Sequence, residues 1–217
     1  MKRAVLAGLL IATLTACGTT VAGAPTWPGA TLDKVALTAA DFPAGVLYDR
    51  VVESPDQPDG AGGPAAMLSK PPGCTDGLTK AISASAERGP GSAVKYSALY
   101  DGARIVMTVL SWHLDLAKLD AVATRCAQFE AFFDTQTPGI PMTTTKLPAD
   151  DGALVFEQTM KLGSAQRSVY MVFQNVDSMA VFGIASPVPN PAINVKASLP
   201  QTFLDIATRQ ADRIRAL

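Results

Sequence analysis

Three cysteines and one histidine are the residues whose chemistry this sequence could use most directly: Cys17, Cys74, Cys126 and His113. A cysteine sulfur can be lipidated, can pair as a disulfide or can bind a metal. An imidazole can act as a general base near neutral pH. A single histidine excludes a multi-histidine metal site, and it leaves His113 as the one imidazole that catalysis could use.

The first cysteine ends an N-terminal targeting segment. Residues 1–3 (Met-Lys-Arg) are a positive start, and residues 4–14 form an uncharged apolar run that is too short to span a bilayer. Leu14-Thr15-Ala16-Cys17 follows and resembles the bacterial lipobox. This resemblance implies that diacylglycerol is attached to the Cys17 sulfur and that the chain is cleaved before it. The alternative is an ordinary signal peptide cut near Ala22 or Ala24.

This interpretation divides the N-terminus into two parts. We expect residues 1–16 to be a lipoprotein signal peptide, and residues 17–32 to be the lipidated cysteine and an uncharged, flexible tether rich in Gly, Ala, Thr and Pro. Two or more acyl chains hold a protein stably on a bilayer. The mature chain is therefore expected to be extracytoplasmic and anchored to the cell membrane without spanning it.

Cys74 and Cys126 remain after lipidation, and an even pair in an oxidising compartment favours one disulfide. Closing a loop of roughly 50 residues would stabilise the fold by about 4 kcal/mol in the chain-entropy model. Helical spacing of Leu119, Val122 and Cys126 directs the Cys126 sulfur toward the core. A redox-active or metal-binding pair is the alternative, but the sequence has no CxxC spacing and no cluster of Cys or His. We expect neither a metal nor a cofactor.

Catalytic patterns are few. His113 lies between Ser111 and Asp115, which could in principle form a Ser–His–Asp triad, but no GxSxG nucleophile elbow is present. Asp150 and Asp151 are adjacent, and adjacent side chains at a turn usually diverge, so we interpret them as turn residues. We therefore expect that the protein is not an enzyme. A cell-envelope hydrolase that uses His113 remains the alternative.

Composition narrows the class of protein further. Hydrophobic residues make up 48% of the chain, enough for a packed core. The formal net charge of −1 argues against a dense basic surface for nucleic acid, so we expect no nucleic-acid partner.

Apolar periodicity predicts an alternation of helices and strands after a Pro/Gly-rich loop over 53–73. Asp115 is expected to cap the second helix, and Ser198 with Gln201 to form a capping box before the third. Aromatic side chains on the strands are expected to lie mainly in the core: Tyr96, Tyr100, Phe156, Tyr170, Phe173 and Phe182. The predicted helices cover 75–87, 116–133 and the segment after Ser198; the predicted strands cover 94–100, 105–112, 154–162, 169–176 and 179–185, with Thr143-Thr144-Thr145 as an edge strand.

Hairpin connections between these strands imply an α+β fold. We expect a single antiparallel sheet of about 5–6 strands, packed against helices on one face and held by one disulfide. No second core is evident, so residues 33–217 are predicted to form one domain.

With the lipobox, the segment Leu37-Thr38-Ala39-Ala40-Asp41-Phe42-Pro43-Ala44-Gly45 and the Cys74…Cys126 pair, the chain resembles uncharacterised lipoproteins of mycobacteria and related actinobacteria. From Cys74 through Arg125-Cys126-Ala127 it is also similar to the extracellular sensor domain of mycobacterial serine/threonine kinases. That resemblance implies a disulfide-linked antiparallel sheet with a cleft for an unknown ligand. It transfers no ligand-binding residue.

The expected function is therefore binding rather than catalysis. We expect a membrane-anchored, extracytoplasmic lipoprotein that binds a small apolar ligand, a lipid or an envelope partner in a cleft beside the sheet. An accessory or structural envelope protein that acts through a surface patch is a further alternative.

Replacing Cys17 with Ser should abolish lipid attachment, because the thioether needs the cysteine sulfur. Mass spectrometry of protein extracted from membranes should show the mass of a chain beginning at Cys17 plus diacylglycerol for the wild type. The Cys17→Ser chain should carry no lipid. A lipid-free wild-type chain that begins at residue 23 or 25 would contradict this interpretation.

Overall fold

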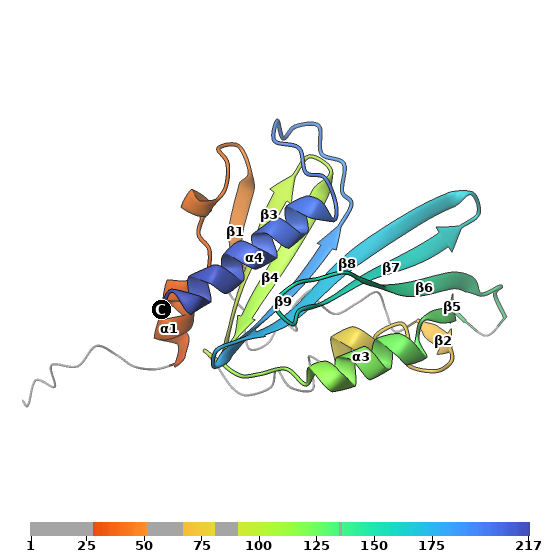
Figure 1. Cartoon of the computed structure of the whole chain (residues 1–217). Coiled ribbons are helices and arrows are strands. Elements are labelled where there is room, and N and C mark those ends of the chain that lie inside the picture. Colours follow the sequence, from red (N-terminus) through yellow and green to blue (C-terminus); the bar gives the residue numbers. More distant parts are fainter. Residues whose placement is uncertain (1–27, 52–66, 81–90, 135) are drawn as a thin grey trace, which may run out of the picture.

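The computed structural model describes residues 28–51, 67–80, 91–134 and 136–217, and Figure 1 shows how its elements are arranged. Its central feature is a nine-stranded sheet with the order β1-β3-β4-β9-β8-β7-β6-β5-β2, in which neighbouring strands are antiparallel. The strands are β1 (Leu47–Val51), β2 (Leu68–Lys70), β3 (Ala93–Tyr100), β4 (Ala103–Leu110), β5 (Gln128–Phe132), β6 (Ile140–Leu147), β7 (Leu154–Leu162), β8 (Ala165–Val176) and β9 (Met179–Ser186). The helices that lie wholly within the described residues are α1 (Pro28–Val35), the 3-10 helix η1 (Ala39–Asp41), α3 (Leu116–Arg125) and α4 (Gln201–Arg215).

The predicted α+β class and antiparallel sheet are confirmed, but the sheet is larger than the expected 5–6 strands. Three strands differ from the expectation: β1 lies where no strand is predicted, β2 lies in the predicted loop over 53–73, and β5 lies in a predicted helix. β1 and β2 are short strands at the two edges of the sheet, where a few residues give little periodicity to recognise.

The helix predicted over 116–133 is too long. α3 ends at Arg125, Cys126 is its C-cap, and Phe129 lies on β5 instead of continuing the helix. On β5, buried Phe129 and Ala131 alternate with exposed Gln128 and Glu130, which is the period of a strand. Phe129 fits both periods, so its spacing from Cys126 did not reveal the change.

The hairpin of β3 and β4 and the meander of β7, β8 and β9 are confirmed. The Thr143–Thr145 segment is a strand but not an edge strand, because β6 lies between β5 and β7. Of the helix predicted over 75–87, residues 77–80 are helical, with Leu78 buried, and residues 81–87 lie outside the described residues.

Helix ends are predicted in part. The Asp115 carboxylate caps α3 by accepting a hydrogen bond from the Lys118 N–H at 2.9 Å. The capping box expected at Ser198 is absent, because α4 begins at Gln201 with Pro200 as its N-cap and no side-chain cap. One face of α4 is buried, and it includes Phe203, Ile206, Gln210 and Ile214.

Helices cover both faces of the sheet, not the single face that was expected. α1 and α4 pack on the face that carries Tyr96, Met107 and Val172. α3 packs on the opposite face, against a cluster that includes Phe156 and Phe173. The two helix groups also cover different halves, because α4 contacts β8 and β9 whereas α3 contacts β6 and β7 (Figure 1).

Gly183, on β9, permits close packing of α4. A Cβ atom at this position would lie 2.6 Å from Met107 Sδ and 2.8 Å from the Phe203 ring. Glycine in a strand interior often marks such an approach. The absent side chain at Gly183 therefore lets Phe203 lie directly on the middle of the sheet.

The Gln210 side chain is completely buried and joins three parts of the chain. Its Oε1 accepts hydrogen bonds from the Leu37 N–H and the Tyr96 hydroxyl, each at 3.1 Å. Its Nε2 donates to the Val35 carbonyl at 2.8 Å. We call these four residues the Gln210 network; it fastens the N-terminal segment to α4 and to β3.

An ion pair lies beside this network. The Arg213 guanidinium donates to both carboxylate oxygens of Asp41, at 2.9 and 3.0 Å. Burial alone would raise the pKa of Asp41, but hydrogen bonds from Thr38 and the charge of Arg213 outweigh it and hold that pKa below its usual value. Since the folded-state pKa is lowered, the charged pair contributes stability at neutral pH and loses it in acid, as Asp41 protonates.

The N-terminal boundary of the domain differs from the expected one. Residues 28–32 belong to α1, and Leu32 and Val35 are fully buried. The predicted flexible tether over 17–32 therefore differs from the structure in its last residues, because α1 begins at Pro28 and Leu32 is fully buried. The predicted signal peptide, Cys17 and residues 18–27 lie outside the described residues.

Candidate binding surface

We call β7, β6, β5 and β2 the outer half of the sheet. One face of this half carries no helix among the described residues. α4 covers β8 and β9 on its side of the sheet, but its contacts do not extend to β5 and β6. An open depression of about 410 Å³ lies on these outer strands. It is lined by Lys70, Gln128, Phe129, Glu130, Pro141, Met142 and Thr143.

Strand register explains why these residues meet. Lys70 lies opposite Glu130, Glu130 lies opposite Pro141, and Gln128 lies opposite Thr143. Residues that are direct partners in a sheet share a face, so these five side chains lie on one surface spanning β2, β5 and β6. An ammonium, a carboxylate, an amide and a hydroxyl therefore surround the apolar ring of Pro141. This set can form hydrogen bonds with a polar group while a short apolar segment contacts its centre.

A tyrosine lies on the same face, nearer to α4. The Tyr170 hydroxyl donates to Glu157 Oε1 at 3.2 Å, and the two residues are direct partners on β8 and β7. Burial raises the pKa of Tyr170, and the neighbouring Glu157 charge raises it further. The phenol therefore stays neutral and remains a donor at physiological pH.

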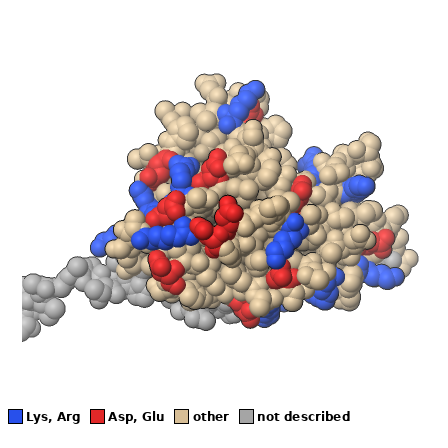
Figure 2. Space-filling model, in the orientation of Figure 1, with Lys and Arg blue, Asp and Glu red and all other residues tan. Residues whose placement is uncertain are grey.

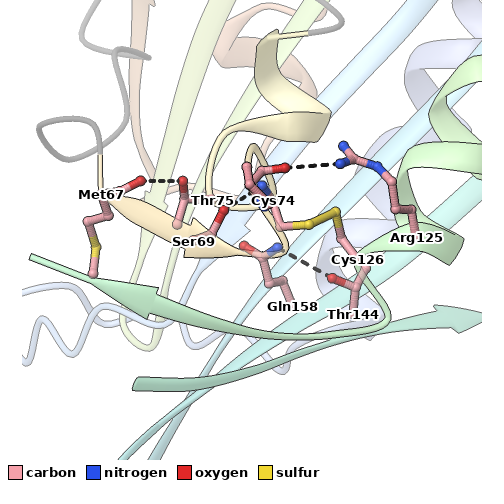
Figure 3. The surroundings of a disulfide bond; sticks show 9 residues. Met67, Ser69, Cys74, Thr75, Arg125, Cys126, Thr144 and Gln158 are labelled. Atoms are coloured by element: carbon pink, nitrogen blue, oxygen red, sulfur yellow. Dashed lines mark hydrogen bonds between the residues drawn. A yellow bond between two sulfur atoms is a disulfide. The ribbon is translucent and has the colours of Figure 1, made fainter. Parts of the chain in front are cut away.

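The predicted Cys74–Cys126 disulfide is present. It holds the outer half of the sheet from the face opposite the depression. Both cysteines are buried and cluster with Phe129 and Ala131 of β5. Figure 3 shows the bridge between the segment after β2 and the end of α3. The disulfide therefore fixes the strands that line the depression to α3.

Hydrogen bonds around the bridge stabilise β2, which has only three residues. The Cys74 N–H donates to Ser69 Oγ at 2.8 Å, and the Thr75 hydroxyl donates to the Met67 carbonyl at 2.7 Å (Figure 3). The Arg125 guanidinium donates to the Pro72 carbonyl at 3.0 Å. These contacts position Lys70 beside Glu130 at the edge of the sheet.

His113 and the acidic residues considered for catalysis lie elsewhere. The His113 Nε2 contacts the Asp177 carbonyl oxygen, and the Asp115 carboxylate is engaged in the α3 cap. The Ser111–His113–Asp115 grouping is therefore not assembled. Asp151 is a turn residue, as expected; its φ is +55°, and its carboxylate pairs with Arg215 at 3.0 Å.

The strand aromatics behave mainly as predicted. Tyr96, Tyr100, Phe156, Phe173 and Phe182 are buried in the two core clusters. Tyr170 is half-buried and borders the open face. The residues of the depression are not among the predicted site residues, because the sequence pattern predicts a helix at β5 and a loop at β2. The alternation of exposed Gln128 and Glu130 with buried Phe129 is the pattern that could have revealed this surface.

None of the helices in the described ranges is long and apolar enough to cross a membrane.

Comparisons with known proteins support the fold. No protein-family model matches the chain, and no curated protein sequence matches it. The structure is similar to the extracellular domain of PknH from Mycobacterium tuberculosis, with 9% sequence identity and a TM-score of 0.52, covering 87% of this chain and 97% of that one. It is also similar to an uncharacterised protein from Mycobacterium smegmatis, an Rv0999 ortholog, with 14% identity and a TM-score of 0.46, covering 87% and 95%. The predicted weak similarity to the mycobacterial kinase sensor domain is thus confirmed at the level of the fold.

Removing the disulfide should destabilise the fold and release β2 first. A Cys74→Ala/Cys126→Ala variant should lose about 4 kcal/mol of unfolding free energy, since the bridge closes a loop with a sequence separation of 52 residues. Denaturant unfolding measures the loss, and hydrogen exchange should show faster exchange in β2 than in β3. Cys17→Ser is the matched control and should leave the stability unchanged. Equal stability of the double variant and the control would contradict the role of the bridge.

Proposed function

We propose that the protein is an extracytoplasmic, lipid-anchored lipoprotein with a non-catalytic binding domain. In this proposal, the open depression on β2, β5 and β6 binds a lipid headgroup or an exposed segment of an envelope partner. The depression is the observation that carries the proposal, because it combines charged, polar and apolar side chains on a face that no described helix covers.

The form of the depression favours a ligand held at the surface. A small apolar ligand usually occupies a concave site that encloses most of its area. Here the lining side chains of Lys70, Gln128 and Glu130 are exposed. Both core clusters are filled by the protein's own side chains, including Tyr96, Phe156 and Phe173 at below 2% exposure. We therefore prefer a lipid headgroup or an envelope partner to an enclosed apolar molecule.

Three further observations support the extracytoplasmic placement. The lipobox-like Leu14-Thr15-Ala16-Cys17 sequence implies export and lipid attachment. A buried disulfide is typical of oxidising compartments. The structural neighbour from Mycobacterium tuberculosis is itself an extracellular domain. The hydrolase alternative gains no such support, because His113 and Asp115 each contact other groups.

Filling the depression should abolish binding while leaving the fold intact. Thr143 is exposed on β6 and lines the depression, so Thr143→Trp places a bulky ring in it. Thr124→Trp, at an exposed position on α3, is the matched control. Native mass spectrometry of each protein, extracted from membranes in mild detergent, should show a co-purifying lipid or partner with the wild type and with Thr124→Trp. Thr143→Trp should lose at least about nine-tenths of it.

Two results would contradict this function. Retention of the same bound species by Thr143→Trp would show that the depression is not the site. Hydrolysis of any envelope substrate by the wild type, lost in His113→Ala, would favour the enzyme alternative.

A further inference from the structure

Large apolar side chains are exposed together at the free ends of the outer strands. Phe133 is 73% exposed, Leu68 is 50% exposed and Leu162 is 45% exposed. Register places them at one end of the sheet: Leu68 lies opposite Phe132, and the start of β6 pairs with the end of β5 and with the end of β7. We call this end the outer rim: Leu68, Phe132, Phe133, Ile140 and Leu162.

Basic side chains flank the outer rim. The β7–β8 hairpin runs from Lys161 through Leu162 to Arg167 and contains no acidic residue. At the other end of the rim, Lys70 is opposite Glu130. The remaining rim acid, Asp134, accepts hydrogen bonds from backbone N–H groups of the turn that follows it. Figure 2 shows several basic side chains over the outer strands, at the right of the molecule. The positive charge of the hairpin therefore has no acidic residue within the hairpin itself to balance it.

We propose that the outer rim rests in the headgroup region of an anionic bilayer. Exposed Phe and Leu side chains enter the boundary between headgroups and acyl chains, and Lys161 and Arg167 contact anionic headgroups. This proposal rests on the proposed function and makes it more specific. The depression adjoins the outer rim, so it would lie close to the membrane surface when the rim is bound. A lipid headgroup is accordingly the ligand class that fits the site best.

The geometry of the chain permits this contact. Cys17 precedes α1 by 11 residues, which reach at most about 37 Å when extended. A domain of this size is roughly 40 Å across. Figure 1 shows α1 and the outer strands on opposite sides of the molecule. An anchored domain that lies along the membrane can therefore place its outer rim on the bilayer while its N-terminus stays within reach of the lipid anchor.

The test uses the mature chain, residues 17–217, with Cys17→Ser, which retains every described residue and carries no acyl chain. Co-flotation with vesicles of phosphatidylglycerol and phosphatidylcholine measures binding. Leu68→Ser/Phe133→Ser/Leu162→Ser should lower the partition coefficient of the protein onto vesicles by about tenfold or more. Lys161→Gln/Arg167→Gln should weaken it by a similar factor at low salt, with a smaller dependence on salt.

Matched control variants distinguish the effect of the outer rim from the effect of substituting any exposed residue. Leu47 and Leu217 are 56% and 70% exposed away from the rim, so Leu47→Ser/Leu217→Ser should bind vesicles like the unaltered chain. Lys34→Gln/Lys118→Gln is the control for charge. Absence of vesicle binding by the unaltered chain, or equal weakening by the rim and control variants, would overturn the proposal. Because this chain carries no lipid anchor, the outcome is independent of whether Cys17 is lipidated.

Discussion

The hydrogen bonds of the buried Gln210 amide are the interaction on which the arrangement of the inner half of the sheet (β1, β3, β4, β9 and β8) depends. Its partners, Val35, Leu37 and Tyr96, come from the N-terminal segment and from β3. A buried polar group that loses its partner costs about 1–3 kcal/mol, so α4 and the N-terminal segment hold these positions together. Since Phe203 of the same helix packs on Gly183, the network also fixes the middle of the sheet. The end of α1 is therefore attached to both α4 and β3.

The outer half is stabilised by a different device, and this difference creates the candidate site. The Cys74–Cys126 bridge and α3 cover one face of the outer strands, whereas α4 does not extend over the other face of β5 and β6. Covalent attachment from one side lets the opposite face stay open without loss of the short strand β2. The depression and the outer rim both belong to this part of the sheet, so the two proposed contacts lie where none of the described helices covers the strands.

Sequence patterns predicted the interior of the fold well and its edges poorly. Alternating apolar and polar residues predict β7, whereas a continuous apolar run predicts β9, which is buried on both faces. Parity and compartment predict the cysteine pair. β1 and β2 escaped because three or five residues give no usable period. Phe129 satisfies both helical and strand spacing, and tertiary pairing with β6 decided between them. The residues of the depression could not be predicted, since their proximity follows from cross-strand register.

Hydrogen exchange of the chain on anionic vesicles, compared with the same chain in detergent, tests most directly whether the outer rim contacts the bilayer while the Gln210 network stays intact. The account predicts slow exchange of the Leu37 amide in both states, because it is bonded to Gln210. It predicts vesicle-dependent protection at residues 132–134 and 161–167. Protection confined to α1 and α4, with the outer rim unchanged, would contradict it.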